Sequence, residues 1–332
     1  MAQTYPLGGL STPAGLTAFI ITTISIVLVT VVLILRVLAK RVSHRPFKAH
    51  DYIYFIGYIF AVCYSAQFLS GIHPGVIGIP IDDALRLYPD ETESVFKIIA
   101  ASTFIWAFAT ALVKLSLLSY YLTIFTTRDF QLMAYIVAIL SVMLAIAGIL
   151  IGSLMCRPFA YSWDRTIAGG RCGDSLKMQL STCLVNIILD FMIVLLPLPL
   201  LWTLHVSLKK KALLSGIFSL GLCICAINIT RTILVVNQDV VDTTHGIALI
   251  GLFSILEVNV GCICAGLPTL GPLVFRAQRR KKDFVPKINT FVRLRQAALK
   301  NNYGSAQMLS TMDEDELPLQ EMERGISCSV RE

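Results

Sequence analysis

Seven apolar stretches, each long enough to cross a lipid bilayer, dominate the sequence. The hydrocarbon core of a bilayer is about 30 Å thick, so a spanning helix needs about 20 mostly apolar residues. The stretches run approximately over residues 16–38, 52–69, 95–125, 132–154, 178–202, 212–236 and 246–275. Hydrophobic residues make up 55% of the chain and charged residues 15%, far from the composition of a soluble domain. We therefore expect an all-α membrane protein, a bundle of seven transmembrane helices that has the lipid bilayer as its solvent.

Basic residues in the short loops indicate how the bundle is oriented, because they favour the cytosolic side. They gather at or just after the ends of the first, fifth and seventh stretches: Arg36, Lys40, Arg41, Arg45, Lys48; Lys209, Lys210, Lys211; Arg276, Arg279, Arg280, Lys281, Lys282. We expect an N-terminus outside the cell and a C-terminus in the cytosol. The net charge of +7 follows from this anchoring to an anionic leaflet and does not indicate nucleic-acid binding.

This orientation divides the chain into three parts. Residues 1–15 form a short extracellular N-terminus without a basic residue, so the first helix is expected to be a signal anchor and not a cleaved signal peptide. Residues 16–275 form the seven-helix membrane domain. Residues 276–332 form a cytosolic tail, first basic and then acidic, with a composition typical of disorder.

Two of the nine cysteines, Cys156 and Cys172, lie in an expected outer loop, where oxidation is possible. We expect a disulfide that holds this loop over the bundle; the alternative is two free thiols. Two further cysteine pairs are spaced by one residue: Cys223 with Cys225, and Cys262 with Cys264. That spacing points side chains to nearly opposite faces of a helix, so we interpret these pairs as small core residues. We expect neither a metal site nor a cofactor.

Ionisable residues inside the apolar stretches mark a candidate site. An ionised side chain at mid-bilayer costs roughly 2.5–3.5 kcal/mol on insertion scales, so it is carried for a reason. Asparagines accompany these charges at spacings of three or four residues, which places them on shared helix faces. The candidate cluster is Lys114, Asn186, Asp190, Asn228, Arg231 and Glu257. It either pins the packing of the helices or contacts a ligand, and the sequence does not choose between the two.

Two prolines near helix ends, Pro197 and Pro268, interrupt the backbone hydrogen-bond ladder. They are candidates for hinges, although proline kinks also occur in passive bundles.

An ordered set of motifs resembles the fungal rhodopsin-domain family of integral membrane proteins, related to the satratoxin-cluster membrane protein and akin to fungal seven-helix receptor-like proteins. The motifs are residues 114–125, Cys156-Arg-Pro with Trp163-Asp164, residues 170–174, 186–190 and 196–202, Arg231, Glu257 and residues 267–272. These motifs lie between residues 114 and 272, and the resemblance covers about residues 16–275. The chain departs from the family pattern at His50-Asp51, which keeps one acidic residue where two are usual.

The resemblance implies a receptor-like or a pathway-accessory role. Retinal is not expected, because its Schiff base needs a lysine in the last helix and residues 246–275 contain none. As a receptor, the chain would sense a small lipophilic or amphiphilic molecule at Asn186, Asp190, Arg231 and Glu257, and bias helices hinged at Pro197 and Pro268. A cytosolic signalling partner would bind the third inner loop and the tail.

Two alternatives remain. One is an accessory membrane protein or an enzyme of a secondary-metabolite pathway, although the five histidines show no metal-ligand spacing and an enzyme is the less favoured reading. The other is a transporter, which the missing inverted repeat disfavours. The sequence predicts a multi-pass membrane protein and does not choose between the plasma membrane and an endomembrane.

Overall fold

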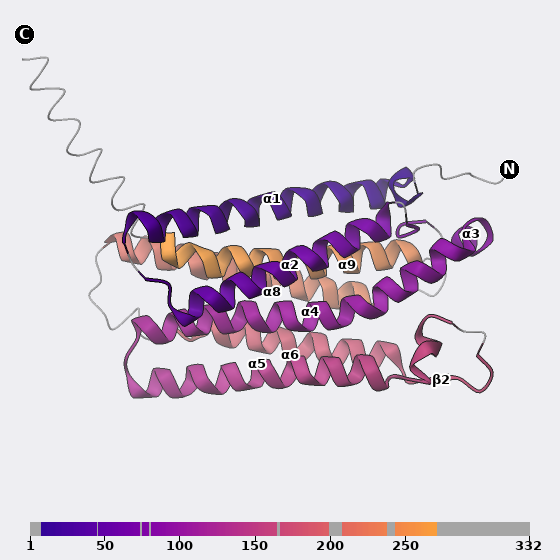
Figure 1. Cartoon of the computed structure of the whole chain (residues 1–332). Coiled ribbons are helices and arrows are strands. Elements are labelled where there is room, and N and C mark those ends of the chain that lie inside the picture. The colour runs from indigo at the N-terminus through magenta and orange to yellow at the C-terminus, as the bar shows by residue number, and fades with distance from the viewer. Residues whose placement is uncertain are drawn as a thin grey trace, which may run out of the picture. The chain divides into compact units, whose positions relative to one another are not determined.

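The computed structural model describes residues 8–44, 46–73, 75–79, 81–164, 167–198, 208–237 and 243–270. Seven of its helices are long and apolar enough to cross a membrane: α1 (Pro13–Val42), α2 (Ala49–Ile72), α4 (Pro89–Ile124), α5 (Arg128–Leu154), α6 (Ser175–Leu195), α8 (Leu208–Val236) and α9 (Thr243–Gly266). They lie side by side as a bundle (Figure 1). The short elements are η1 (Gly8–Ser11), α3 (Ile81–Leu87), β1 (Cys156–Arg157), η2 (Phe159–Ser162), β2 (Arg171–Cys172) and η3 (Leu267–Leu270). The expected seven-helix fold is confirmed.

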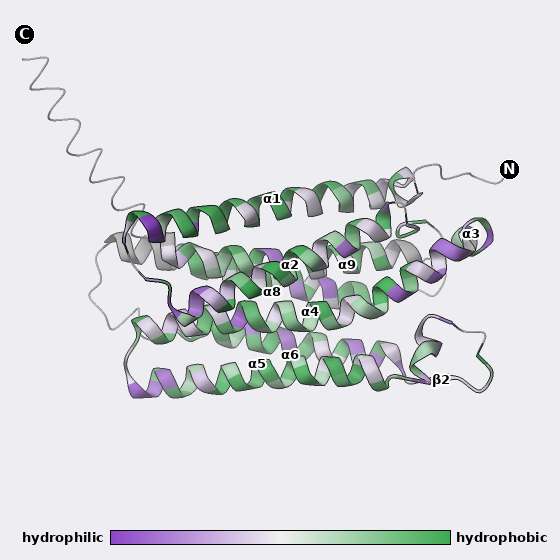
Figure 2. Cartoon of the chain, viewed as in Figure 1, coloured by the Kyte–Doolittle hydropathy of each residue, from purple (hydrophilic) through white to green (hydrophobic). Residues whose placement is uncertain are grey.

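Helices α1 and α5 are mostly hydrophobic along their length, as Figure 2 shows. On α5, Leu132, Ile139 and Met143 are 60%, 62% and 58% exposed, which suits a face in contact with lipid. Helix α9 differs, because 61% of the residues in its most apolar 18-residue segment are buried, against 22% for the corresponding segments of α1 and of α5. Helix α9 is therefore the central helix of the bundle.

Several helix ends differ from the expected spans, for local reasons. Helix α1 begins at Pro13 because the Thr12 side chain accepts a hydrogen bond from the Gly15 N–H (3.2 Å) and proline suits a first helical position. Helix α6 ends at Leu195, just before Pro197, and α9 ends at Gly266, just before the 3-10 turn that holds Pro268. Neither proline thus kinks the helix that precedes it; each lies beyond a helix end.

The segment between α5 and α6 is a small hairpin closed by the expected disulfide, Cys156–Cys172. Its two strands are antiparallel and pair Cys156 with Cys172 and Arg157 with Arg171. The Phe159 ring packs against Trp163 (centroids 5.1 Å apart) and against Phe104 of α4 (6.4 Å). The disulfide therefore holds a segment that is also anchored to the bundle by aromatic contacts.

Removing this disulfide should destabilise the protein. A crosslink across a loop of about 15 residues contributes about 3 kcal/mol, and this one joins cysteines 16 residues apart. We expect the double variant Cys156→Ser with Cys172→Ser to lose about this much and to melt at a lower temperature in detergent. Cys63→Ser, which removes an exposed free thiol, is the control; equal melting temperatures for the two variants would contradict the prediction.

The loop between α2 and α3 is buried beside the start of α1. Val76, Ile77 and Ile79 are at most 3% exposed. The Gly9 N–H donates to the Gly75 carbonyl (3.0 Å), which joins this loop to η1. Gly78 has a φ of +102°, a conformation that favours glycine. This loop therefore packs as part of the core beside the start of α1.

The closely spaced cysteines divide between the two environments. Cys225, Cys262 and Cys264 are buried, as expected, whereas Cys223 is exposed. The expectation of a core position is wrong for Cys223, because a residue two positions from buried Cys225 lies on the opposite face of α8.

Candidate functional site

The six residues of the candidate cluster meet in one network inside the bundle. Lys114 comes from α4, Asn186 and Asp190 from α6, Asn228 and Arg231 from α8, and Glu257 from α9. Each is at most 8% exposed. We call these six residues the polar network.

One half of the polar network is built on Asp190. Its Oδ1 lies 2.8 Å from Lys114 Nζ, and its Oδ2 accepts a hydrogen bond from Asn228 Nδ2 (2.7 Å). Lys114 Nζ also donates to Asn186 Oδ1 (2.7 Å). This half joins α4, α6 and α8.

The other half is built on Glu257. Its Oε2 accepts from Arg231 (3.0 Å) and its Oε1 accepts from Asn186 Nδ2 (2.7 Å). The Arg231 guanidinium also lies 4.7 Å from the centre of the Trp106 ring, within the range of a cation–π interaction. Asn186 uses both ends of its amide, one for each half, and so links the two ion pairs.

The polar network is electrically balanced. It holds two cations, Lys114 and Arg231, against two carboxylates, Asp190 and Glu257. An unpaired charge in a low-dielectric interior is strongly unfavourable, so each charge here requires its partner. Four helices are therefore held together by charged groups whose separation would cost much free energy.

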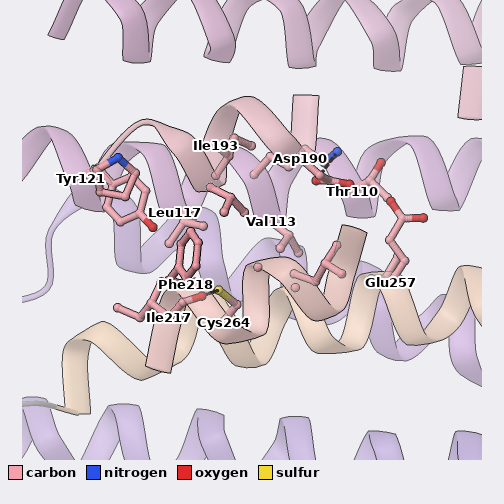
Figure 3. A pocket seen from close by; sticks show the side chains of 17 residues that line it. Thr110, Val113, Leu117, Tyr121, Asp190, Ile193, Ile217, Phe218, Glu257 and Cys264 are labelled. Atoms are coloured by element: carbon pink, nitrogen blue, oxygen red, sulfur yellow. Dashed lines mark hydrogen bonds and ion pairs between the residues drawn. The ribbon is translucent and has the colours of Figure 1, made fainter. Parts of the chain in front are cut away.

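A cavity borders the polar network on one side (Figure 3). Its volume is about 50 Å³. One water needs roughly 10–15 Å³ on the same measure, so the cavity has room for more than one water. Lys114, Asp190 and Glu257 line its polar end. Tyr121, Pro197 and Phe218 also line it, and Figure 3 shows Tyr121 and Phe218 across the cavity from Glu257. The remaining lining residues are Thr110, Val113, Leu117, Ile193, Val194, Ile217, Gly221, Ile224, Val258, Gly261 and Cys264.

The structure also shows a second buried ion cluster, which the sequence analysis missed. Asp51 accepts from Arg36 Nη2 (3.0 Å), lies 2.7 Å from Lys40 Nζ, and accepts from the Lys48 backbone N–H (2.9 Å). Arg36 and Asp51 are both 0% exposed. The expectation that Arg36 belongs to the loop after the first helix is wrong, because Arg36 lies inside α1, which continues to Val42. The spacing of Arg36 and Lys40, one helical turn, was the available signal.

Helix α9 receives further polar contacts along its length. Asn259 donates to Ser25 of α1 (2.8 Å) and to Ser65 of α2 (3.3 Å). At its end, Arg36 donates to the Ala265 carbonyl (2.8 Å), and the Tyr120 hydroxyl donates to the Pro268 carbonyl (3.0 Å). A cation and a hydroxyl there satisfy carbonyl groups that a helix end leaves without partners. Helix α9 is thus bonded to its neighbours at three levels.

The chain is similar in sequence to several curated proteins. Three curated relatives are the fugralins biosynthesis cluster protein 2 of Gibberella zeae (29% identical over 36% of this chain and 30% of that protein), the receptor GIN3 of Arthrobotrys oligospora (24%, over 73% and 56%), and the polyenoic acids biosynthesis gene cluster protein Ba17b of Metarhizium anisopliae (20%, over 89% and 88%). The matched region thus spans less than two thirds of the first two relatives. No solved structure is significantly similar to the chain.

The sequence profile of the fungal rhodopsin domain matches residues 35–276, a range that contains the polar network, the cavity and the disulfide. The chain is a multi-pass membrane protein that belongs to the fungal rhodopsin domain family.

Proposed function

We propose that the chain is a receptor-like membrane protein that responds to a small lipophilic or amphiphilic molecule bound in the cavity beside the polar network. The observation that carries this proposal is the sharing of side chains: Lys114, Asp190 and Glu257 belong to the polar network and also line the cavity. A molecule in the cavity would touch the same groups that hold α4, α6, α8 and α9 together.

The mechanism follows from that sharing. A ligand shifts a conformational equilibrium only through contacts that differ between the two arrangements. Contact with Lys114 or Asp190 changes how α4 is held to α6, and contact with Glu257 changes how α9 is held to α8. Pro197 lines the cavity just beyond the end of α6, which makes it the candidate hinge where that helix ends. Pro268, whose carbonyl accepts from Tyr120, is the candidate hinge on α9.

The position of the cavity indicates how a ligand would reach it. We expect entry from the bilayer or from the end at Pro197, because Pro197 lines the cavity just beyond the end of α6. A cytosolic partner would bind the loop after α6 and the tail and respond to the change in helix arrangement. This loop (199–207) and the tail, with the residues before it (271–332), lie outside the described part of the chain. The relative that is named as a receptor supports the receptor-like role of the chain.

A second candidate function is an accessory role in a biosynthetic pathway. Two of the relatives are named as proteins of biosynthesis clusters. In that role the cavity would hold a lipophilic intermediate, and loss of the protein would change a product and not a response.

A charge-balanced variant tests the receptor proposal. Lys114→Met combined with Asp190→Leu removes one ion pair and leaves no unpaired charge, so the helices should still assemble. We expect a normal amount of protein in its membrane and a lost transcriptional response to lipophilic compounds. The control is Lys97→Met with Glu93→Leu. These two residues form an exposed ion pair on α4, the helix that also carries Lys114, with Lys97 Nζ 2.8 Å from Glu93 Oε1.

A retained response in the Lys114/Asp190 variant would contradict the proposal. Loss of the protein from the membrane, with the control pair normal, would show instead that the polar network only pins the helices.

A further inference from the structure

The polar end of the cavity has no spare charge. Lys114 and Asp190 face each other at 2.8 Å, and Glu257 is held by Arg231 at 3.0 Å. Each of the four carboxylate oxygens already has a donor or a cation within 3.0 Å. A charged ligand would therefore add an uncompensated charge to a buried, balanced site, which is unfavourable for either sign.

The polar end does have a spare donor. The ammonium group of Lys114 carries three N–H bonds, and two of them are directed to Asn186 and Asp190. Nothing in the described part of the chain accepts the third, and Lys114 lines the cavity. An oxygen atom of a ligand can accept that hydrogen bond, and a ligand hydroxyl can in turn donate to a carboxylate of Asp190 or Glu257.

The other polar groups of the wall are committed or distant. The Thr110 hydroxyl donates to the Trp106 carbonyl (2.9 Å), and the Cys264 thiol donates to the Ile217 carbonyl (3.7 Å). Tyr121 lies across the cavity from Glu257 in Figure 3. Between these ends the wall is aliphatic, with side chains such as Val113, Leu117 and Val194. The cavity therefore combines a charged polar end, an aliphatic middle and the tyrosine Tyr121 at the opposite end.

We infer that the cavity takes an uncharged molecule with an oxygen head group, an alcohol or a carbonyl compound, whose oxygen accepts from Lys114 and whose hydrocarbon part lies along the aliphatic wall. This inference rests on the proposed function and narrows it to a ligand class. A carboxylate or an ammonium compound of the same length should bind more weakly because of its charge, and a plain hydrocarbon leaves the third Lys114 N–H without an acceptor.

Six-carbon probes test this ligand class. The full chain is purified in lipid nanodiscs, and the binding of 1-hexanol, 2-hexanone, hexanoate, hexylamine and hexane is measured at pH 7 by competition and by shift of the melting temperature. We expect apparent dissociation constants about tenfold lower for hexanol and hexanone than for hexanoate, hexylammonium and hexane, the difference that one well-made polar contact gives.

Matched variants separate the cavity from the surrounding lipid, which also takes up these probes. Val194→Phe fills the cavity, whereas Val185→Phe makes the same change on the same helix at a position that is 45% exposed. Binding should be lost in the first and kept in the second. Val194→Leu is a milder filling variant for the case in which the phenylalanine prevents folding, and it should weaken binding in the same order of probes. The Lys114→Met and Asp190→Leu double variant should bind hexane and hexanol equally well.

The outcomes distinguish the ligand class from the receptor function. Tighter binding of hexanoate or hexylammonium would overturn the ligand class and leave a receptor with a charged ligand. Equal binding by the wild type and Val194→Phe would overturn the cavity as the site. In that case the receptor function is tested separately by the cellular response: a response lost in Val194→Phe but kept in Val185→Phe would preserve it, and a response kept in both would remove it.

Discussion

Replacing Glu257 by leucine should lower the free energy of unfolding by about 3–5 kcal/mol, the range for breaking a buried ion pair by removing one partner. Arg231 would keep its charge in an interior position that is 6% exposed, with the Trp106 ring but without a carboxylate. Asn186 would also lose the acceptor for its Nδ2. The measurement is reversible unfolding of the purified protein in mixed micelles, compared with the wild type.

The double variant Arg231→Met with Glu257→Leu decides whether this loss comes from the unpaired charge. Replacing both members of a buried pair by apolar residues of similar volume is often neutral or stabilising, so the double variant should be more stable than Glu257→Leu alone. If the double variant were as unstable as the single one, the loss would come from packing at Glu257 and not from its charge.

The second large effect is expected at Asp51. Leucine at this position would leave Arg36 unpaired in the interior and would also remove the partner of Lys40 and the acceptor for the Lys48 backbone N–H. We expect a loss of about 3–5 kcal/mol, since this too uncovers a buried charge. The measurement is the same unfolding equilibrium, together with the yield of folded protein from membranes.

Glu93→Leu is the control for Asp51→Leu. Glu93 also forms an ion pair, with Lys97 at 2.8 Å, but both side chains are about half exposed (52% and 53%). Pairs in water contribute about 0–1 kcal/mol, so this variant should change stability little. Comparable losses at Asp51 and Glu93 would mean that the burial of the Arg36–Asp51 pair does not determine its contribution.

The number of helices and the disulfide could be predicted from the sequence because both rest on strong local signals. Apolar stretches of about 20 residues have few structures other than a spanning helix. Cys156 and Cys172 were the only cysteines in an expected outer loop. Helix ends were predicted less well, since α1 begins three residues earlier and ends four residues later than the expected 16–38, at Pro13 and Val42. Hydropathy does not detect the capping threonine, nor the basic last turn that still belongs to the helix.

The members of the polar network could be predicted from the sequence, but the hydrogen bonds and ion pairs between them could not. Helical spacing placed Asn186 with Asp190 and Asn228 with Arg231, because these intervals are set within one helix. Which carboxylate pairs with which cation depends on how α4, α6, α8 and α9 are arranged, and a single sequence does not specify that arrangement. The cavity is unpredictable for the same reason. Its wall joins residues of α4, α6, α8 and α9 that become neighbours only in the folded bundle.

The most direct test of the receptor account is a comparison of a strain lacking this gene with its parent, in which untargeted metabolites and the transcriptional response to external lipophilic compounds are measured together. The strain is complemented with the wild type, with Val194→Phe and with Val185→Phe. The account predicts unchanged metabolites and a lost response, restored by the wild type and Val185→Phe but not by Val194→Phe. Loss of a single metabolite with an unchanged response would contradict it and assign the chain to a biosynthetic pathway.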